Sequence, residues 1–216
     1  MTVMLITGGS KGIGRAFAEH FKDKYEIVTV ARTGNVTEKG DITDSKFRQH
    51  LVEKYTPTVF VNNAGIKTHA FMSTFETNVM AAGDLLSKFY RKMPKGDIIN
   101  ISSFSANAKG WDSISDFKIW YNASKRVITE MSDYLSVAKH RPVRVTAIEP
   151  NHVNTTFNKG KIYKIDYNEY GLDIFSPIPP SYIAEVADWI LKQPPYVVIS
   201  NIKIDNFYRK NTRRPQ

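Results

Sequence analysis

Short apolar runs alternate with segments of helical periodicity along most of this chain. Runs rich in Val, Ile and Phe predict buried strands at residues 3–6, 26–31, 58–61, 97–101, 143–148 and 196–199. Other segments carry apolar residues at helical spacing and predict helices at residues 15–21, 45–55, about 75–89, about 121–135 and 181–191. Strands that alternate so regularly with helices form a parallel sheet covered on both faces. We therefore predict an α/β fold, a doubly wound, mostly parallel sheet with helices on both faces.

The composition favours one domain of this kind. The chain has 216 residues, of which 42% are hydrophobic, and no break in composition, which suits a single core of good size. We assign residues 1–202 to the domain and residues 203–216 to a basic C-terminal tail.

The charged, cysteine-free composition narrows the classes of function. The absence of Cys excludes disulfides, thiolate metal sites and a cysteine nucleophile. The formal net charge is +9, and +4 of it lies in residues 203–216, where five Lys or Arg accompany one Asp. This concentration favours a solvated tail over a nucleic-acid-binding arm, because no block of Lys and Arg inside the chain is typical of nucleic-acid binding. No leader precedes the first strand and no apolar run has the length of a membrane span, so we expect a cytoplasmic protein with no membrane partner.

Residues 7–14 form a glycine-rich turn between the first predicted strand and the first predicted helix. Gly8 permits a tight turn, Gly12 lets the backbone approach a pyrophosphate, and Gly14 lets the helix pack on the strand. The helix N-terminus then offers N–H groups and a positive dipole end to the phosphates. The spacing is G-x-x-x-G-x-G rather than G-x-G-x-x-G, and such a turn alone also fits an ordinary connection. The strand before it and the helix after it favour a dinucleotide site.

Polar segments after later strands bear on the same ligand. Arg32 and Thr33 follow the second strand, where the adenosine ribose lies in dinucleotide folds, and no acid is present to bond a free 2′-hydroxyl. A cation there accommodates a 2′-phosphate, so we predict NADP(H) rather than NAD(H) as the cofactor. Asp41 could accept a hydrogen bond from the adenine amino group, or it could be an ordinary acidic residue of a loop. Asn63 follows the third strand, at the sheet edge where open α/β sheets bind ligands.

Tyr121 and Lys125 are the strongest candidates for acid–base chemistry. They lie four residues apart on a predicted helix and so share one face. A tyrosine titrates near pH ~10, and a neighbouring ammonium favours its phenolate, which makes the pair a tuned general acid and base. The spacing alone also fits a solvated helix face.

Short motifs occur in a fixed order along the chain. They are Thr7-Gly8-x-x-x-Gly12-x-Gly14, Asn62-Asn63-Ala64-Gly65, Asn78, Ile101-Ser102-Ser103, Tyr121-x-x-x-Lys125 and Pro150-x-x-Val153-x-Thr155. In this order and on these elements they resemble the short-chain dehydrogenase/reductase family, in its compact single-domain branch. The resemblance covers residues 2 to about 200. It implies a Rossmann-like fold and makes the predicted domain a single dinucleotide-binding catalytic unit.

The resemblance also implies a catalytic set of four residues. Tyr121 would protonate a substrate carbonyl or deprotonate an alcohol, and Lys125 would lower the pKa of Tyr121 and hold the nicotinamide ribose. Ser103 would polarise the substrate oxygen, and Asn78 would hold a water that passes protons towards Lys125. The five histidines show no ligand spacing, so we expect no metal site.

The cofactor-binding set implied by the resemblance draws on most of the same motifs. It comprises Gly8, Ser10, Lys11, Gly12, Ile13, Gly14, Arg32, Thr33, Asp41, Ile42, Asn63, Ala64, Gly65, Tyr121, Lys125, Val153 and Thr155. Lys11 lies where NADP-using members of the family often carry a base, and Val153 and Thr155 would lie beside the nicotinamide carboxamide.

Departures from the family pattern surround the predicted substrate pocket. The segment 66–74 is shorter than the family usually has, and the segment 104–120 is longer. Asn151 stands where the family usually has Gly. We therefore expect a small-molecule carbonyl or alcohol substrate, whose identity the resemblance does not determine. We further predict that residues 154–180 form a mobile substrate lid, although an ordered surface excursion fits as well. Its aromatic residues are Phe157, Tyr163, Tyr167, Tyr170 and Phe175.

We expect a homo-oligomer, either a dimer or a tetramer. The family commonly pairs the long helix that bears the catalytic tyrosine, and Val127, Met131 and Tyr134 enlarge the apolar face of that helix. The main alternative function is a non-catalytic dinucleotide-binding protein that senses redox state, which the intact catalytic set disfavours. A hydrolase that uses Ser103 would need a histidine base, and no motif supplies one.

Overall fold

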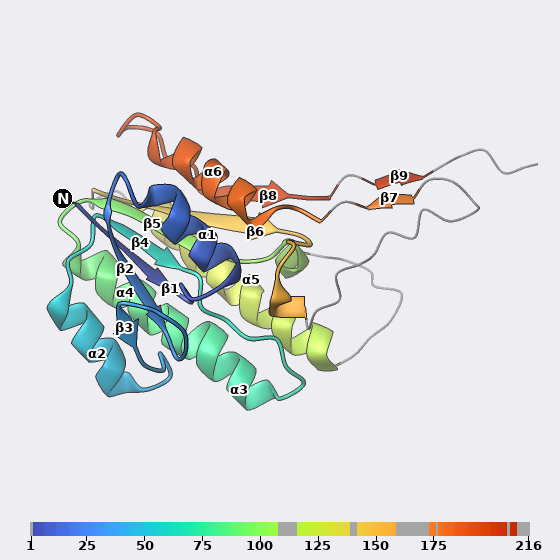
Figure 1. Cartoon of the computed structure of the whole chain (residues 1–216), viewed down its shortest axis with the longest axis horizontal. Coiled ribbons are helices and arrows are strands. Elements are labelled where there is room, and N and C mark those ends of the chain that lie inside the picture. Colours follow the sequence, from blue (N-terminus) through green and yellow to red (C-terminus); the bar gives the residue numbers. More distant parts are fainter. Residues whose placement is uncertain are drawn as a thin grey trace, which may run out of the picture.

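A seven-stranded parallel sheet forms the centre of the molecule (Figure 1). The computed structural model describes residues 2–107, 116–138, 142–158, 173–175, 177–206 and 208–210. The strand order is β3-β2-β1-β4-β5-β6-β8, and every neighbouring pair is parallel. The strands are β1 Val3–Thr7, β2 Glu26–Ala31, β3 Glu38–Lys39, β4 Val59–Asn62, β5 Gly96–Ile101, β6 Val143–Pro150 and β8 Asn201–Ile204. The predicted doubly wound parallel sheet is confirmed.

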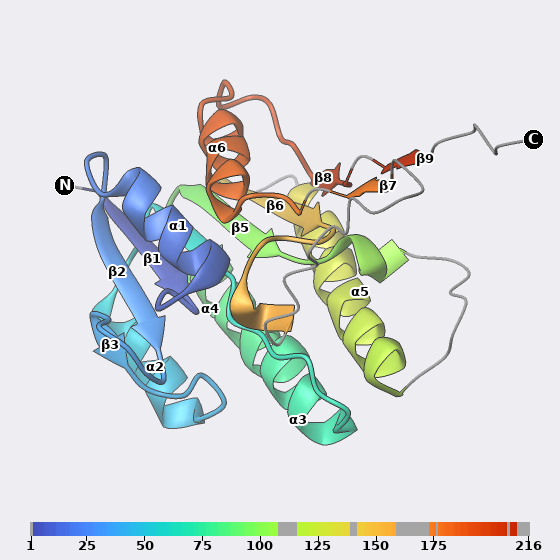
Figure 2. The same cartoon turned by 45° about the vertical axis from the view of Figure 1, so that its right-hand side comes forward.

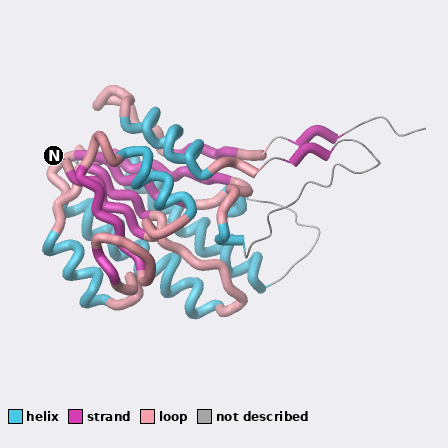
Figure 3. Tube along the Cα trace, in the orientation of Figure 1, coloured by secondary structure: helices cyan, strands magenta, loops and turns pink. Residues whose placement is uncertain are grey.

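Helices cover both faces of this sheet (Figures 2 and 3). They are α1 Gly12–Phe21, α2 Ser45–Lys54, α3 Phe71–Phe75, α4 Ala82–Lys92, α5 Asp116–Ser136 and α6 Pro180–Leu191. Successive residues of β1 face opposite layers, because Met4 and Ile6 pack with α1 and α6 while Leu5 packs with α2 and α4. Burial on both faces explains why the strands are continuous apolar runs rather than alternating ones.

The helical stretch after β4 is longer and less regular than predicted. We predicted a helix from about residue 75 to residue 89, whereas the structure has α3, a π-helical turn at Glu76–Ala81, and α4. Asn78 lies within the π-helical turn with only 2% of its surface exposed. Turns of this kind often occur at functional sites, and this one places Asn78 against the loop that follows β4.

The last strand of the sheet was predicted at the wrong place. The apolar run at 196–199 is not a strand, and β8 begins at Asn201. Side chains of β6 hold the backbone of the earlier segment, because Arg144 Nη1 donates to the Val197 carbonyl at 3.3 Å and Thr146 Oγ1 donates to the Ile199 carbonyl at 2.6 Å. Backbone pairing with β6 therefore starts only at the Ser200 carbonyl, which accepts from the Ala147 N–H.

Two further strands pair outside the main sheet. β7 (Asp173–Phe175) and β9 (Tyr208–Lys210) form an antiparallel ribbon, visible beside the sheet in Figure 1. The ribbon joins the segment predicted as a lid to the predicted tail, and β8 includes Lys203 and Ile204 from that tail. Residues 159–172 and 176 of the predicted lid lie outside the described residues, as do residues 108–115 and 211–216. The lid therefore stays a prediction. No helix among the described residues is long and apolar enough to cross a membrane.

Candidate active site

A cavity of about 740 Å³ lies at the carboxyl edge of the sheet. The strand order reverses at β1, which lies between β2 and β4. Open α/β sheets usually bind their ligands at the carboxyl ends of the strands beside such a reversal. The turn after β1, the end of β2, the loops after β4, β5 and β6, and the first turns of α5 all line it. Every residue of the predicted catalytic and cofactor-binding sets lines this cavity except Gly14 and Asn78, which pack beside it.

The glycine-rich turn has the shape that a bound pyrophosphate requires. Gly8 and Gly12 adopt positive φ angles of 69° and 58°, which favour glycine. The Gly8 N–H donates to the Val30 carbonyl at 2.8 Å, which fixes the turn against β2. No side chain caps the start of α1 at Lys11, and the first helical residues, Gly12 and Ile13, face the cavity. The helix N-terminus is thus open to an anion, so the turn fits a dinucleotide phosphate.

Gly14 is expected to tolerate no side chain, because α1 and the turn are in direct contact there. A Cβ on Gly14 would lie 2.3 Å from the Gly8 carbonyl oxygen and 2.7 Å from Asn63 Nδ2. We expect Gly14→Ala to lower the free energy of unfolding by about 1–3 kcal/mol, the usual cost of overpacking. It is also expected to weaken NADPH binding, since relieving the clash displaces the turn. Thermal unfolding and NADPH fluorescence titration measure the two effects.

Gly83→Ala is the matched control for that substitution. Its Cβ would meet only the flexible end of Met131, at 3.2 Å from Cε, and alanine gains about 1 kcal/mol of helix propensity over glycine. We expect this variant to keep or raise the Tm. Equal Tm values for the two variants would contradict the assigned contact.

The loop after β4 is tied to the glycine-rich turn through a buried threonine. Thr7 Oγ1 accepts hydrogen bonds from the backbone N–H groups of Asn63 and Ala64 at 3.0 and 3.1 Å. In return, Asn63 Nδ2 donates to the carbonyls of Thr7 and Gly8 at 2.9 and 3.2 Å. Thr7 is completely buried, and no spacing rule in the sequence assigned it a role. It makes the β1 turn and the Asn63 loop a single unit.

The predicted ribose end of the cavity contains an ion pair. Arg32 Nη1 lies 3.6 Å from Asp41 Oδ2, with 65% and 41% of these side chains exposed. Burial acts to raise the pKa of Asp41, but hydrogen bonds from Thr43 and the charge of Arg32 outweigh it and hold the pKa below its usual value. The sequence treated Arg32 and Asp41 as separate candidates, and the structure brings them together at this end with Ser10, Lys11, Thr33 and Ile42.

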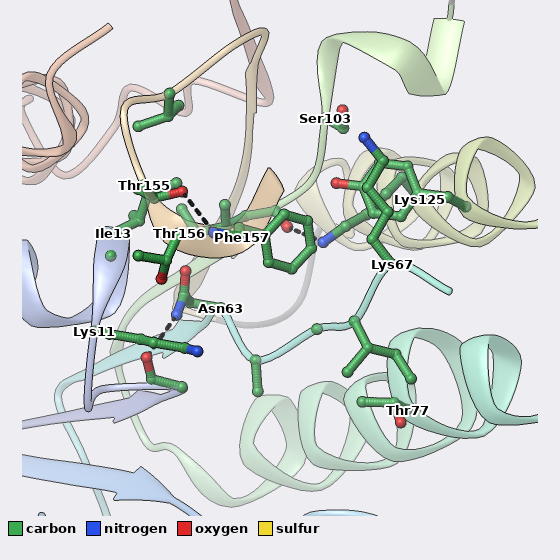
Figure 4. A pocket seen from close by; sticks show the side chains of 18 of the residues that line it. Lys11, Ile13, Asn63, Lys67, Thr77, Ser103, Lys125, Thr155, Thr156 and Phe157 are labelled. Carbon is green, nitrogen blue, oxygen red and sulfur yellow. Dashed lines mark hydrogen bonds between the residues drawn. The ribbon is translucent and has the colours of Figure 1, made fainter. Parts of the chain in front are cut away.

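The opposite end gathers the residues predicted for catalysis. Ser103, Tyr121 and Lys125 are buried, with 8%, 9% and 6% of their surfaces exposed, and all three line the cavity. Lys125 Nζ donates to the Ile101 carbonyl at 2.7 Å and lies 5.9 Å from the centre of the Tyr121 ring (Figure 4). Gly65 also lies here, where a Cβ would come within 3.5 Å of Lys125 Nζ.

The pKa of Tyr121 moves in the direction opposite to our expectation. Burial raises the pKa of Tyr121 to about 12, and its hydrogen bond with Ser103 opposes the rise only in part. Burial also lowers the pKa of Lys125 to about 8. The sequence predicted that Lys125 would lower the Tyr121 pKa, but the ammonium bonds a carbonyl instead and burial dominates. Tyr121 is therefore a protonated phenol here, the form that can donate a proton.

Buried hydrogen bonds hold the helix that carries this pair. Ser102 Oγ donates to the Lys125 carbonyl at 3.0 Å, and Ser124 Oγ donates to the Tyr121 carbonyl at 2.7 Å. Asn78 Nδ2 donates to Ser124 Oγ at 3.0 Å and to the Ile66 carbonyl at 2.8 Å, and its Oδ1 accepts from the Ile66 N–H. The Asn78 side chain thus connects the loop after β4 to α5. Its predicted role in holding a water stays a prediction.

Two further residues that line the cavity lie close to the Tyr121 ring. The ring of Phe157 lies 6.0 Å from that of Tyr121, and Lys67 Nζ lies 5.3 Å from the Tyr121 ring centre (Figure 4). Sequence analysis missed Lys67, because a lone lysine in a loop carries no spacing signal. Val153 and Thr155 line the same cavity, and Thr155 Cγ2 would lie 3.3 Å from a Cβ on Gly12.

Comparisons with known proteins agree with this geometry. Residues 2–165 match the family model described as short chain dehydrogenase. The chain is 32% identical to L-fucose dehydrogenase of Rattus norvegicus, over 71% of this chain and 66% of the relative. It is 27% identical to L-rhamnose 1-dehydrogenase (NAD(P)(+)) of a Sphingomonas species, over 77% of this chain and 78% of the relative. A solved structure, the closed form of serine dehydrogenase complexed with NADP+, superposes with a TM-score of 0.76 at 20% identity, covering 99% of this chain and all of that one. With the family model matching most of the chain and the glycine-rich turn, Ser103, Tyr121 and Lys125 in one cavity, the chain belongs to the short-chain dehydrogenase/reductase family.

Proposed function

We propose that this protein is an NADP(H)-dependent oxidoreductase that interconverts a carbonyl compound and an alcohol. One observation carries the proposal: a single cavity joins an anion-accepting glycine-rich turn at one end to a buried Ser103, Tyr121 and Lys125 at the other. A dinucleotide that spans the cavity would have its phosphates at the turn and its reactive ring beside Tyr121.

The chain's own residues supply proton transfer and placement. When bound, the nicotinamide ring supplies or accepts the hydride. Tyr121, held protonated by burial, donates its proton to the carbonyl oxygen during reduction. Ser103, already hydrogen-bonded to Tyr121, donates to the same oxygen and stabilises the charge that develops on it. Lys125 contributes a cation 5.9 Å from the centre of the Tyr121 ring, and its charge would favour the phenolate that accepts the proton of the alcohol in the oxidation direction.

The residues that would hold the cofactor line the same cavity, with the exception of Gly14, which packs beside it. Gly8, Gly12 and the N-terminus of α1 would bind the phosphates, and Arg32 with Lys11 would bind a 2′-phosphate. The cavity walls around Asn63 and Thr155 would enclose the rest of the dinucleotide.

A carbonyl panel assayed for NADPH oxidation tests the proposal. The panel contains an aldehyde, a cyclic ketone, an aldose and a 3-oxoacyl thioester, and we expect measurable reduction of at least one of them. NADPH fluorescence is recorded in parallel. Binding of NADPH without reduction of any compound would support the alternative, a non-catalytic redox-sensing protein.

A homo-oligomer is also part of the proposal, and α5 is the surface that would form it. Tyr134 is 79% exposed on this helix and Val137, just after it, is 72% exposed, while Val127 and Met131 are partly buried and Met131 packs towards Gly83. Exposed apolar side chains that are neighbours on one helix face are typical of interfaces. We expect sedimentation at micromolar concentration to show a multiple of 24.6 kDa, and Tyr134→Glu to shift it towards that mass.

Tyr196→Glu provides the control for the oligomer, since Tyr196 is equally exposed, at 86%, but lies between α6 and β8. It is expected to leave the sedimentation profile of a dimer formed through α5 unchanged. A parent protein that sediments only at 24.6 kDa would refute the oligomer.

A further inference from the structure

We infer that Glu149 is a positioning residue for the proposed reaction, because its buried carboxylate holds the backbone turn after Ser103 against α5. This turn, Phe104–Asn107, is called the Ser103 turn below. The inference rests on the proposed function and adds to it a residue outside the cavity lining. It depends on a set of hydrogen bonds that require an acceptor at Glu149.

Glu149 lies near the end of β6, and none of its surface is exposed. Its Oε1 accepts hydrogen bonds from Thr129 Oγ1 of α5 at 3.0 Å and from Asn201 Nδ2 of β8 at 2.9 Å. Asn107 Nδ2, at the end of the Ser103 turn, donates to Oε1 and Oε2 at 3.2 and 3.0 Å. Donors of this kind replace the water that a carboxylate loses on burial. Glu149 therefore joins β6, β8, α5 and the Ser103 turn.

The Ser103 turn determines where the Ser103 hydroxyl lies. The Ala106 N–H donates to the Ser103 carbonyl at 2.9 Å. The Ser105 N–H donates to Ser103 Oγ at 3.3 Å, and the two hydroxyl oxygens lie 2.8 Å apart. Asn107 ends this turn, so its bond to Glu149 fixes the backbone that carries these contacts. The hydroxyl that would polarise the substrate carbonyl is thereby held in place.

The same carboxylate holds the stretch of α5 beside Lys125. Thr129 comes one helical turn after Lys125, and its Oγ1 lies 2.7 Å from Ser102 Oγ. Ser102 Oγ also donates to the Lys125 carbonyl at 3.0 Å. The carboxylate thus contacts both elements whose relative position the proposed reaction needs, the Ser103 turn and the helix that carries Tyr121.

Arg126 explains why the position requires a carboxylate. Arg126 Nη1 donates to Asn107 Oδ1 at 2.7 Å. A guanidinium can only donate, so the Asn107 oxygen faces Arg126 and its NH2 group faces Glu149. In Glu149→Gln, the new oxygen can still accept from Thr129 and Asn201. The new NH2 group would then meet that of Asn107, and two donors cannot bond each other.

A reciprocal exchange of amide and carboxylate tests this arrangement. In the double variant Glu149→Gln with Asn107→Asp, the new aspartate accepts from Arg126 with one oxygen and from the new glutamine NH2 with the other. If the double variant does not fold, Glu149→Gln with Arg126→Met replaces it. Without the guanidinium, Asn107 can turn its amide and accept from the new glutamine.

We expect Glu149→Gln to lower kcat about tenfold or more on a carbonyl compound that the parent reduces, because small misplacements of reacting groups have effects of this size. KM should change little, and NADPH affinity should stay near that of the parent, since the glycine-rich turn lies outside this set of bonds. The double variant should recover most of the lost kcat. Asn107→Asp alone should stay impaired, because it places two carboxylates together.

Hydrogen exchange of the Ala106 N–H, measured by NMR, gives a readout that needs no turnover. This N–H is bonded to the Ser103 carbonyl and reports whether the Ser103 turn is held. We expect Glu149→Gln to speed its exchange several-fold and the double variant to restore its protection.

Asp97→Asn is the matched control, since it also converts a carboxylate with little exposure into an amide. Asp97 lies at the start of β5, at the sheet edge opposite the cavity, and accepts from Arg144 Nε at 2.7 Å. We expect this variant to lower the Tm but to keep kcat and the Ala106 exchange rate. If it loses as much kcat as Glu149→Gln, the effect is one of general stability and the inference is overturned.

The remaining outcomes separate this inference from the proposed function. If Glu149→Gln keeps the parent kcat, or if neither double variant recovers the loss, the inference is wrong while the oxidoreductase stands. If the parent reduces no compound but Ala106 exchange responds to Glu149→Gln and to its rescue, the proposed reaction fails and the anchoring of the Ser103 turn stands. If neither turnover nor a change in exchange is seen, both are wrong.

Discussion

Tyr121→Phe is expected to lower kcat/KM for carbonyl reduction by about a thousandfold, within the range that general acid catalysis contributes. The substitution removes only the phenol oxygen, which carries the proton and the hydrogen bond with Ser103. The ring stays to fill a buried position against Phe157. We therefore expect NADPH to bind within a few-fold of its parent affinity while turnover is lost. Steady-state kinetics on a reduced substrate and fluorescence titration of NADPH measure the two quantities.

Tyr55→Phe is the matched control for the loss of a phenol. Tyr55 donates to Glu38 Oε1 beside α2 and does not line the cavity. This variant should therefore keep kcat/KM. If Tyr121→Phe turns over as fast as the parent, Tyr121 is not the proton donor, and the proposed mechanism has to be abandoned.

The parent enzyme is expected to prefer NADPH over NADH about a hundredfold in kcat/KM, and Arg32→Asp to reverse this preference. Charge-assisted hydrogen bonds contribute about 1.5–3 kcal/mol each, and less where solvent reaches them, as it does at the largely exposed Arg32. A net contribution of about 3 kcal/mol gives roughly a hundredfold preference. An aspartate at this place would repel the 2′-phosphate and bond a free 2′-hydroxyl.

The ion pair between Arg32 and Asp41 calls for a second variant. Asp41→Asn removes the acid that holds Arg32 in the structure, and we expect it to keep or raise the preference for NADPH. Arg15→Asp makes the same change in net charge on the exposed side of α1, where Arg15 pairs with Glu19, and should leave the cofactor ratio unaltered. A parent that uses NADH as well as NADPH, or an unchanged ratio in Arg32→Asp, would disprove the assignment.

Local patterns in the sequence were enough to predict most of the sheet and the composition of the cavity. Strands buried on both faces are continuous apolar runs, and the residues that follow them meet at one edge of a parallel sheet. This rule predicts that Arg32, Asn63 and Ser103 lie near one another, and all three line the same cavity. Tyr121 and Lys125 needed only helical spacing to share a face.

Features that depend on contacts between distant segments could not be predicted in this way. The apolar run at 196–199 has the sequence pattern of a strand. The side chains of Arg144 and Thr146 donate hydrogen bonds to its carbonyls, and the strand that pairs with β6 begins only at Asn201. The raised pKa of Tyr121 depends on how deeply α5 is buried, which the spacing to Lys125 does not reveal. Lys67 became visible only when the loop after β4 was seen beside the Tyr121 ring.

The buried hydroxyl of Thr7 has a consequence for the thermodynamics of cofactor affinity. Thr7 Oγ1 accepts hydrogen bonds from two backbone N–H groups of the Asn63 loop. The segments on either side of the expected pyrophosphate position are therefore already ordered before any ligand binds. Ligand sites made of loops that order only on binding lose affinity to that ordering. Here the folding of β1 beside β4 has already met this entropic cost, so little of the cofactor's binding free energy is consumed in shaping the phosphate end.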